Sequence, residues 1–586
     1  MRSVNRIERD IEHLREGVSP GMVGKVVFNF AVVLILGMLF GCQGAASGSA
    51  PPLDGPSNTD STVSCPDNPR DCVEGDASVD TETSVWPDTD ENTATDAGTS
   101  SADTGSDDAA SVVPDVDSDG PPFIDTDTSN EPLVVGLGIS KIAIYQAPEL
   151  PLMVDWIEAA SPYAVLAARK TAVVRVFVTP QPGWRKREVE ARLHLSSSQL
   201  PTGAYYSEKK TIHGASSPGS LFSTFNIPIP AVYMTEGLAY QVSLHEIEDE
   251  VFEGTAERAR WPAEGASALP VEEAGGLELV LVPIAYDEDG DGIPSLPDTS
   301  ETAIEAIREV FDAFYPVARD GLEIRIAAPL SWQDPITPSG KGWSELLAEL
   351  AIWKSDNEPT AKAYHIGLVA PDDSLDRFCR LGCNTGLAYL VEEPEDAFGK
   401  VAVVLGFDGG TAGRFMIHEV GHGHGIKHTP CGDVDDVDWD YPYNGGSIGV
   451  WGLDISDGEL KDPALETDFM GYCEHQWVSD YVYGALQRWM QDTSRLSSSV
   501  RGLASEWRLF RMTDDSIDIG RKVTLAKPPF GTPIDVELYD SNIDLVGIET
   551  GFFIPHDPML GGIFLVSEPS KKAFYLSLPG SPLISL

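Results

Sequence analysis

Residues 418–428 of the chain read HEVGHGHGIKH, and the spacing of the histidines predicts both a helix and a metal site. His418 and His422 are four positions apart, so on a helix both imidazoles leave one face at a separation that a single ion can bridge. Gly425 follows three positions later, where a residue free to adopt positive φ lets the chain turn sharply. That turn brings His428 round as a third ligand and leaves one tetrahedral position for water, as catalytic zinc requires.

Glu419 directly follows the first histidine. A carboxylate in this position can reach water at the metal without being a ligand, which suits a general base. The pattern H-E-x-x-H-x-x-G-x-x-H fixes five positions and the chain meets all of them. We therefore prefer a zinc site to a helix end that is rich in histidine by chance. His424 points off the ligand face and is expected to be exposed or to support the ligands from outside.

These eleven residues resemble the signature of the metzincin metalloproteases, which is followed downstream by a methionine in a tight turn beneath the metal. Residues 468–472 read DFMGY, so the resemblance implies that Met470 takes this place. Tyr472 matches a tyrosine that some metzincin branches use as an extra ligand or to stabilise an oxyanion, and a buried structural tyrosine is an equal alternative. The resemblance covers about residues 276–495 and implies a zinc endopeptidase with Glu419 as general base.

The pattern around the signature alternates strands and helices in the order of the metzincin N-terminal subdomain. We expect an apolar strand at 277–286, an amphipathic helix that starts near residue 299, and further strands, with an edge strand before the active-site helix at 411–424. A last helix is expected at 480–493. The resemblance therefore implies an α+β metzincin-like catalytic domain at 271–497.

Both flanks of this domain contain short alternating apolar runs separated by proline and glycine turns. Alternation of this kind predicts strands, so we expect a β-sandwich at 131–270 and a small C-terminal β domain at 498–586. A chain of 586 residues is also too long for a single core, which favours a multidomain protein.

The N-terminal 42 residues are expected to be a lipoprotein signal segment. The apolar run Val26–Phe40 is too short to span a bilayer and fits the core of a signal peptide. It ends in residues 39–42, LFGC, which resemble the bacterial lipobox and make Cys42 the lipidated residue, with an ordinary secretory signal as the alternative. Acidic residues upstream suggest a true start at Met22. We expect a lipid-anchored protein of the bacterial cell envelope, and Gln43 indicates the outer membrane or cell surface.

Residues 43–130 are rich in Asp, Ser and Thr, and Arg70 is their single basic residue. Such a segment cannot bury enough apolar area to offset its ordering entropy, so we expect a disordered acidic tether. The formal net charge of the whole chain is -52, and this charge argues against nucleic acid as a partner because an anionic surface repels phosphate.

Six further cysteines form three local pairs. An even number in an exported chain favours disulfides over metal thiolates. The pairs are Cys65 with Cys72, Cys379 with Cys383, and Cys431 with Cys473. The middle pair has the alternative of a metal half-site. The metzincin fold brings the segments of the last pair together, so the resemblance implies that a disulfide ties the two sides of the zinc site.

An acidic segment before the amphipathic helix resembles a calcium loop. Asp287, Asp289 and Asp291 occupy positions 1, 3 and 5 of the loop pattern, Gly292 occupies position 6, and Asp298 falls at position 12. A strand instead of a helix precedes the segment, so a solvated acidic turn is an equal alternative. Any calcium here is expected to be structural.

Together these patterns predict an endopeptidase that acts outside the cell on proteins or glycoproteins. The alternative from another class is a surface adhesion or binding protein with a vestigial protease domain. An unused site has no physical reason to keep Glu419, Met470 and all three histidines. A third reading, a gluzincin-type peptidase, would need Glu459 or Glu466 as a ligand in place of His428.

Overall fold

The computed structural model describes residues 132–247, 252–496, 505–512, 517–525, 528–557, 561–568, 573–578 and 583–586. Cys42, Cys65 and Cys72 lie outside these residues, so the lipid anchor and the first disulfide stay predictions. Within the described ranges, no helix has the length and apolar character needed to cross a membrane. All described residues belong to the second of two units, which spans residues 104–586.

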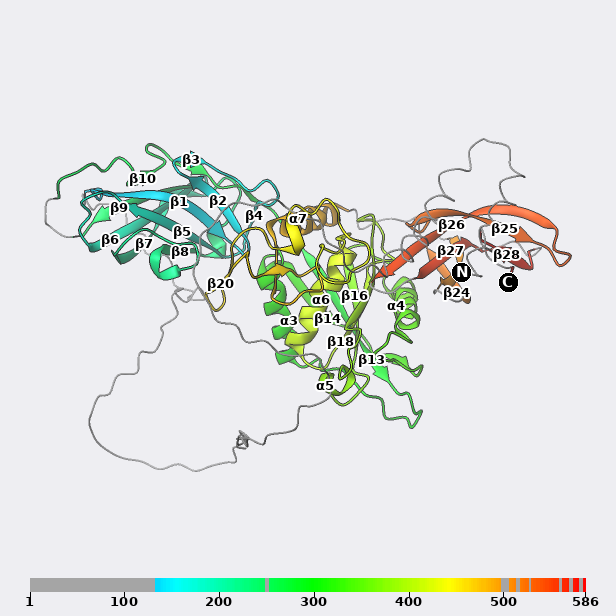
Figure 1. The fold of residues 1–586 in the computed structure, drawn as a ribbon. Coiled ribbons are helices and arrows are strands. Elements are labelled where there is room, and N and C mark those ends of the chain that lie inside the picture. The colour runs from blue at the N-terminus through cyan, green and yellow to red at the C-terminus, as the bar shows by residue number, and fades with distance from the viewer. Residues whose placement is uncertain are drawn as a thin grey trace, which may run out of the picture. The chain divides into compact units, whose positions relative to one another are not determined.

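The first part of the described chain consists of two antiparallel sheets with a common core (Figure 1). Their orders are β3-β2-β1-β5-β8 and β10-β9-β6-β7, with β11 beside β9. The strands are β1 Leu137–Tyr145, β2 Glu149–Val154, β3 Ile157–Glu158, β5 Ala172–Pro180, β6 Arg187–Ser197, β7 Leu200–Ile212, β8 Phe225–Ile229, β9 Ala239–Glu246, β10 Arg260–Trp261 and β11 Ser267–Ala268. Alternate residues such as Ile142 and Ile144 in β1 and Leu193 and Leu195 in β6 are fully buried, as expected where two sheets face each other.

A third sheet consists mainly of parallel strands and packs against the helix that contains His418 and His422. Its order is β14-β13-β16-β18-β17, and β17 alone among these runs antiparallel to its neighbour β18. The strands are β13 Leu277–Tyr286, β14 Leu322–Ile326, β16 Ala363–Val369, β17 Gly386–Tyr389 and β18 Val401–Leu405, and short β15 Leu330–Trp332 also pairs with β13. Strands β16 and β18 are buried along their whole length, which is why β18 is a continuous apolar run and β16 contains one polar side chain, His365.

Helices cover both faces of this sheet (Figure 1). They are α3 Glu301–Phe314, α4 Trp343–Asn357, α5 Leu375–Phe378, α6 Gly409–Gly423 and α7 Asp480–Arg495. Leu279 of β13 shares a core with α3 and α6, whereas its neighbour Val280 shares a core with α4. Because successive strand residues point to opposite faces, α3 and α6 lie on one side of the sheet and α4 on the other. The Ser300 hydroxyl caps the start of α3 by accepting a hydrogen bond from the Ala303 N–H at 3.3 Å.

Between α6 and α7 the chain is irregular and contains four short strands. They are β19 Gly452–Asp454, β20 Glu459–Lys461, β21 Thr467–Asp468 and β22 Gln476–Trp477. β19 pairs with β20, and β21 pairs with β22. The parallel pair β21–β22 holds the two ends of the segment that contains residues 469–475, shortly before α7 begins.

The C-terminal strands continue the sheet that contains β13–β18. They are β23 Ser505–Met512, β24 Ile517–Leu525, β25 Thr532–Tyr539, β26 Leu545–Asp557, β27 Gly562–Ser567, β28 Tyr575–Ser577 and β29 Ile584–Ser585. Ala388 and Tyr389 of β17 pair with Asp557 and His556 of β26, giving one sheet of 13 strands. The second half of β17 therefore does not lie at the edge of the sheet, because a strand far along the chain covers it.

Candidate metal centre

Helix α6 positions two of the three histidines. The Asp408 carboxylate caps its start by accepting a hydrogen bond from the Thr411 N–H at 2.8 Å. After α6 ends, Gly425 has a φ of 72°. A Cβ at this residue would also lie 2.7 Å from the Trp489 ring, so only glycine permits the turn that follows the helix. The chain then returns toward α6 at His428.

The structure brings His418, His422 and His428 together. The Nε2 atom of His418 lies 3.1 Å from that of His422 and 3.3 Å from that of His428. A tetrahedral zinc ion with Zn–N bonds of about 2.0–2.1 Å holds its ligand atoms roughly 3.3–3.4 Å apart. The three ring nitrogens therefore have the separation that zinc needs.

Each of these imidazoles is oriented by a backbone carbonyl. The Nδ1 atom of His418 lies 2.8 Å from the Phe469 carbonyl oxygen, and that of His422 lies 2.8 Å from the Ile426 carbonyl oxygen. The Nδ1 atom of His428 lies 2.7 Å from the Asp435 carbonyl oxygen. A carbonyl only accepts, so Nδ1 carries the hydrogen and Nε2 presents its lone pair to the centre of the cluster. This is the tautomer in which histidine binds a metal through Nε2.

Burial keeps the cluster uncharged. It lowers the pKa of His418 to about 4, with a further contribution from His428, and it lowers the pKa of His422 well below its ordinary value. Burial is also the main reason that the pKa of His428 is lowered. Neutral imidazoles at pH 7 are the form that a metal ion requires.

Glu419 lies between α6 and the start of β17. Its side chain is buried, with 5% of its surface exposed. A Cβ at Gly386 would lie 2.4 Å from the Oε1 atom and 2.6 Å from the Cγ atom of Glu419. The carboxylate therefore occupies the space that a side chain at Gly386 would fill. Sequence reasoning missed this glycine, although a glycine inside a strand is a signal of a close approach.

Met470 lies beneath α6. Its side chain is fully buried, and a Cβ at Gly421 would lie 2.5 Å from its sulfur atom. The Asp468 carboxylate accepts hydrogen bonds from the N–H groups of Met470 and Ser479, both at 2.9 Å. Because the Phe469 carbonyl in the same turn orients His418, Asp468 helps to fix the position of this histidine. Sequence reasoning did not identify Asp468.

Tyr472 stands beside the histidines and is 42% exposed. Its ring centroid lies 4.8 Å from that of His428 and 5.7 Å from that of His418. The structure thus does not place this tyrosine in the buried core. Its ring therefore lies at the surface beside the three clustered histidines.

Two of the three expected cysteine pairs are disulfides in the structure, Cys379–Cys383 and Cys431–Cys473. The first leaves no thiolates for a metal half-site. The second joins the segment after His428 to the residue after Tyr472, where the Tyr472 N–H also donates to the Cys431 carbonyl at 2.8 Å. The loop that carries His428 and the turn that contains Met470 are therefore held to each other.

Other sequence-derived residues have different surroundings. Asp287, Asp289 and Asp291 form an acidic group in the loop after β13. Asp298 is not part of this group, and its carboxylate accepts a hydrogen bond from the Ser300 N–H at 2.9 Å. Calcium binding stays a prediction. The expectation that His424 is exposed or supports the ligands is wrong as to exposure: the ring is 1% exposed and stacks on Tyr364 with a centroid distance of 4.7 Å.

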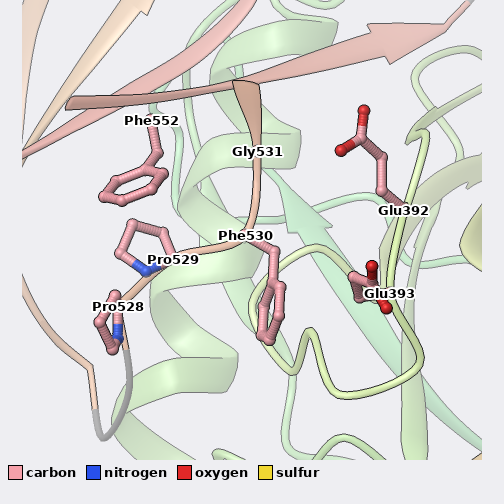
Figure 2. A pocket seen from close by; sticks show the side chains of 7 residues that line it. All are labelled: Glu392, Glu393, Pro528, Pro529, Phe530, Gly531 and Phe552. Carbon is pink, nitrogen blue, oxygen red and sulfur yellow. The ribbon is translucent and has the colours of Figure 1, made fainter. Parts of the chain in front are cut away.

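A pocket of about 430 Å³ lies where the segment after β17 meets the C-terminal strands (Figure 2). Its lining consists of two acidic residues and an apolar wall, Glu392, Glu393, Pro528, Pro529, Phe530, Gly531 and Phe552. None of the three clustered histidines lines it. The pocket is therefore separate from the candidate metal centre.

Comparison with known proteins supports a metallopeptidase. The profile of the family Peptidase M66, a metallopeptidase family, matches residues 396–482, which include all three histidines, Glu419 and Met470. Metalloproteinase-II from Bacteroides fragilis is 13% identical, with 44% of this chain and 78% of that chain covered and a TM-score of 0.19. A putative beta-galactosidase from Bacteroides fragilis is 12% identical, with 40% and 33% covered and a TM-score of 0.12. No curated protein matches the chain.

Proposed function

We propose that the chain is a zinc-dependent endopeptidase of the metzincin type. The proposal is based on the convergence of three neutral imidazoles. The Nε2 atom of His418 lies 3.1 Å from that of His422 and 3.3 Å from that of His428, and each Nδ1 atom contacts a backbone carbonyl. His418, His422 and His428 would be the zinc ligands. The similarity of residues 396–482 to a metallopeptidase family supports the same activity.

When bound, zinc would lower the pKa of water at the open position and polarise the carbonyl of the scissile peptide bond. Glu419 would accept the proton of the attacking water and deliver it to the leaving amine. Its enclosure between α6 and Gly386 supports this role, because a general base must be held within hydrogen-bond reach of its proton. Tyr472 would donate a hydrogen bond to the developing oxyanion from the exposed side of the cluster.

The protein would act at the bacterial cell surface on proteins or glycoproteins. Lipidation of Cys42 would anchor it, and the acidic segment at 43–130 would hold the folded part away from the membrane. The disulfides Cys379–Cys383 and Cys431–Cys473 support an exported protein, because disulfides persist in oxidising compartments.

Two alternatives make different predictions. A surface-binding protein with a vestigial site would bind zinc and cleave nothing. A gluzincin-type peptidase would use Glu459 or Glu466, but the group of metal-ligating side chains found among the described residues contains His428 instead. The arrangement therefore favours three histidines as ligands.

Cleavage profiling of a complex peptide and glycoprotein library tests the proposal. We would compare the full chain, purified in detergent, with its Glu419→Gln variant. Cleavage by the parent alone is the expected result. If neither chain cleaves any substrate although both bind zinc, the surface-binding alternative is favoured. If both chains cleave equally, Glu419 is excluded as the general base.

A further inference from the structure

The pocket between the segment after β17 and the C-terminal strands has two sides of different chemistry. Glu392 and Glu393 stand on one side, and Phe530, Phe552 and two prolines stand on the other (Figure 2). Its volume of about 430 Å³ lies within the range of roughly 300–1,000 Å³ that is common for ligand sites. The pocket is therefore large enough for one long side chain.

The apolar side of the pocket is held in place by the C-terminal strands. The Phe552 ring of β26 packs edge-on against the ring of Trp507, which is buried, with a centroid distance of 5.8 Å. Gly531 has a φ of 149°, and a Cβ there would lie 2.5 Å from the Phe553 carbonyl oxygen, so the chain runs close against β26. Phe530 directly precedes this glycine and is half-buried. One aromatic ring is thus fixed by packing, and the second is attached to a closely held backbone.

The acidic side of the pocket directly follows a contact with α6. The Val391 N–H donates to the His422 carbonyl at 3.1 Å, and the Asp396 N–H donates to the Glu393 carbonyl at 3.0 Å. The backbone of the two glutamates is therefore anchored on both sides. Their side chains are exposed, and within the described part of the chain neither forms an ion pair with a basic residue. Two carboxylates without a cation of their own thus face an apolar wall.

This combination favours an arginine side chain as the occupant. A planar guanidinium can stack on an aromatic ring while its N–H groups donate to carboxylates, and its apolar stem can pack against proline and phenylalanine. Lysine has a compact, strongly hydrated charge that stacks less well. An anion would be repelled by both glutamates, and a neutral apolar group would gain nothing from them.

The place of the pocket in the chain connects this occupant to the proposed reaction. Because Glu392 follows Val391, its Cα atom lies within about 9 Å of the His422 carbonyl oxygen. An extended peptide covers about 3.3 Å per residue, so a peptide bound at the three histidines needs only several more residues to reach the pocket. The histidines themselves do not line the pocket, so the contact lies away from the reacting bond.

We propose that the pocket binds an arginine side chain of the protein substrate, several residues from the scissile bond. The acidic character of the chain, with a formal net charge of -52, favours the approach of cationic segments. The assignment to a substrate rests on the proposed function, whereas the preference of the pocket for arginine does not depend on cleavage.

Binding of Nα-acetyl-arginine amide to the zinc-loaded full chain, followed by calorimetry, tests the pocket. The comparison probe is Nα-acetyl-citrulline amide, which has the same shape and no charge. We expect the arginine probe to bind at least about tenfold more tightly. The double variant Glu392→Gln with Glu393→Gln should lose this preference. The matched control, Glu236→Gln with Glu264→Gln, removes two exposed carboxylates from the β-sandwich part and should keep it.

Two further variants examine the apolar side and the chain's own cation. Phe530→Leu keeps an apolar side chain but removes the ring, and should weaken binding of the arginine probe about two- to fivefold. Lys527, which lies outside the described residues, is the nearest basic residue in the sequence. If Lys527→Ala raised the affinity for the arginine probe at least about tenfold, the chain's own lysine would be the occupant and the proposal would fail.

Cleavage of peptides separates this inference from the proposed function. On arginine-containing peptides cut in the library experiment, the double glutamine variant should raise KM at least about threefold and leave kcat unchanged. Citrulline in place of the arginine should abolish this difference. Equal binding of the two probes to the parent chain would overturn the proposal, even if the parent cleaves peptides. A KM unchanged on every peptide would refute the assignment to the substrate. If the parent binds the arginine probe but cleaves nothing, the proposed function fails, and the assignment to a substrate fails with it.

Discussion

Replacing Gly386 with alanine tests how closely the structure holds the Glu419 carboxylate. The new Cβ would lie 2.4 Å from Oε1 and 2.6 Å from Cγ, whereas heavy atoms in contact settle at about 3.5 Å. The carboxylate must therefore move by about 1 Å, and a misplacement of this size costs roughly 100-fold in rate. We expect kcat to fall by about two orders of magnitude with zinc retained, because the three atoms nearest to that Cβ all belong to Glu419.

The assay combines kcat and KM on one peptide with metal analysis and thermal unfolding. Gly386 does not have a left-handed φ, so alanine fits the backbone, and the crowding itself should cost about 1–3 kcal/mol. Gly547→Ala is the matched control, because a Cβ at that strand glycine meets nothing within 4 Å. A Gly386→Ala chain with the parental kcat would refute the reasoning, since the carboxylate would then not depend on the space at β17.

Four further predictions concern the metal centre. Glu419→Gln should keep its zinc and lose at least about 100-fold in turnover, and loss of the metal would contradict the role of a base. His428→Ala should weaken zinc binding by more than about 100-fold in a chelator competition, whereas Glu466→Gln should not, and the reverse result would point to a glutamate ligand. Replacing both Cys431 and Cys473 by serine should lower the free energy of unfolding in urea by about 4 kcal/mol, because the sequence separation of the bridge is 42, and an unchanged urea midpoint would contradict this. In the zinc-free chain the pKa of His418 is about 4 when folded and about 6.5 when unfolded. Its contribution to stability is therefore fully present above about pH 6.5 and is lost as the pH falls toward 4, so urea midpoints at pH 7 and pH 5 should differ, and equal midpoints would argue against burial of this imidazole.

Local spacing explains what the sequence predicts well. The positions of His418 and His422 follow from the period of a helix, and the turn at Gly425 follows from its freedom to adopt positive φ. The resemblance to the metzincins indicates where to search for Met470. The disulfide Cys431–Cys473 was expected on the same basis and is present in the structure.

Contacts between distant segments explain what the sequence does not predict. Nothing near Gly386 shows that Glu419 will lie against it, because α6 and β17 are separate segments and no local period relates their residues. The burial of His424 depends on stacking against Tyr364 from β16. The pairing of β17 with β26 joins strands that are separated by β18–β22, α6, α7 and β23–β25, and no periodicity in either strand specifies its partner.

The pairing of β17 with β26 also affects how the chain behaves when it is shortened. Removing the C-terminal strands would leave the edge of β17 unpaired at Ala388 and would uncover the apolar cluster that α4 shares with Trp507 and Leu509 of β23. An uncovered strand beside an apolar surface is a template on which further copies can stack into aggregates. The C-terminal strands therefore protect the rest of the chain from aggregation. A fragment that ends near residue 496 would be prone to precipitate.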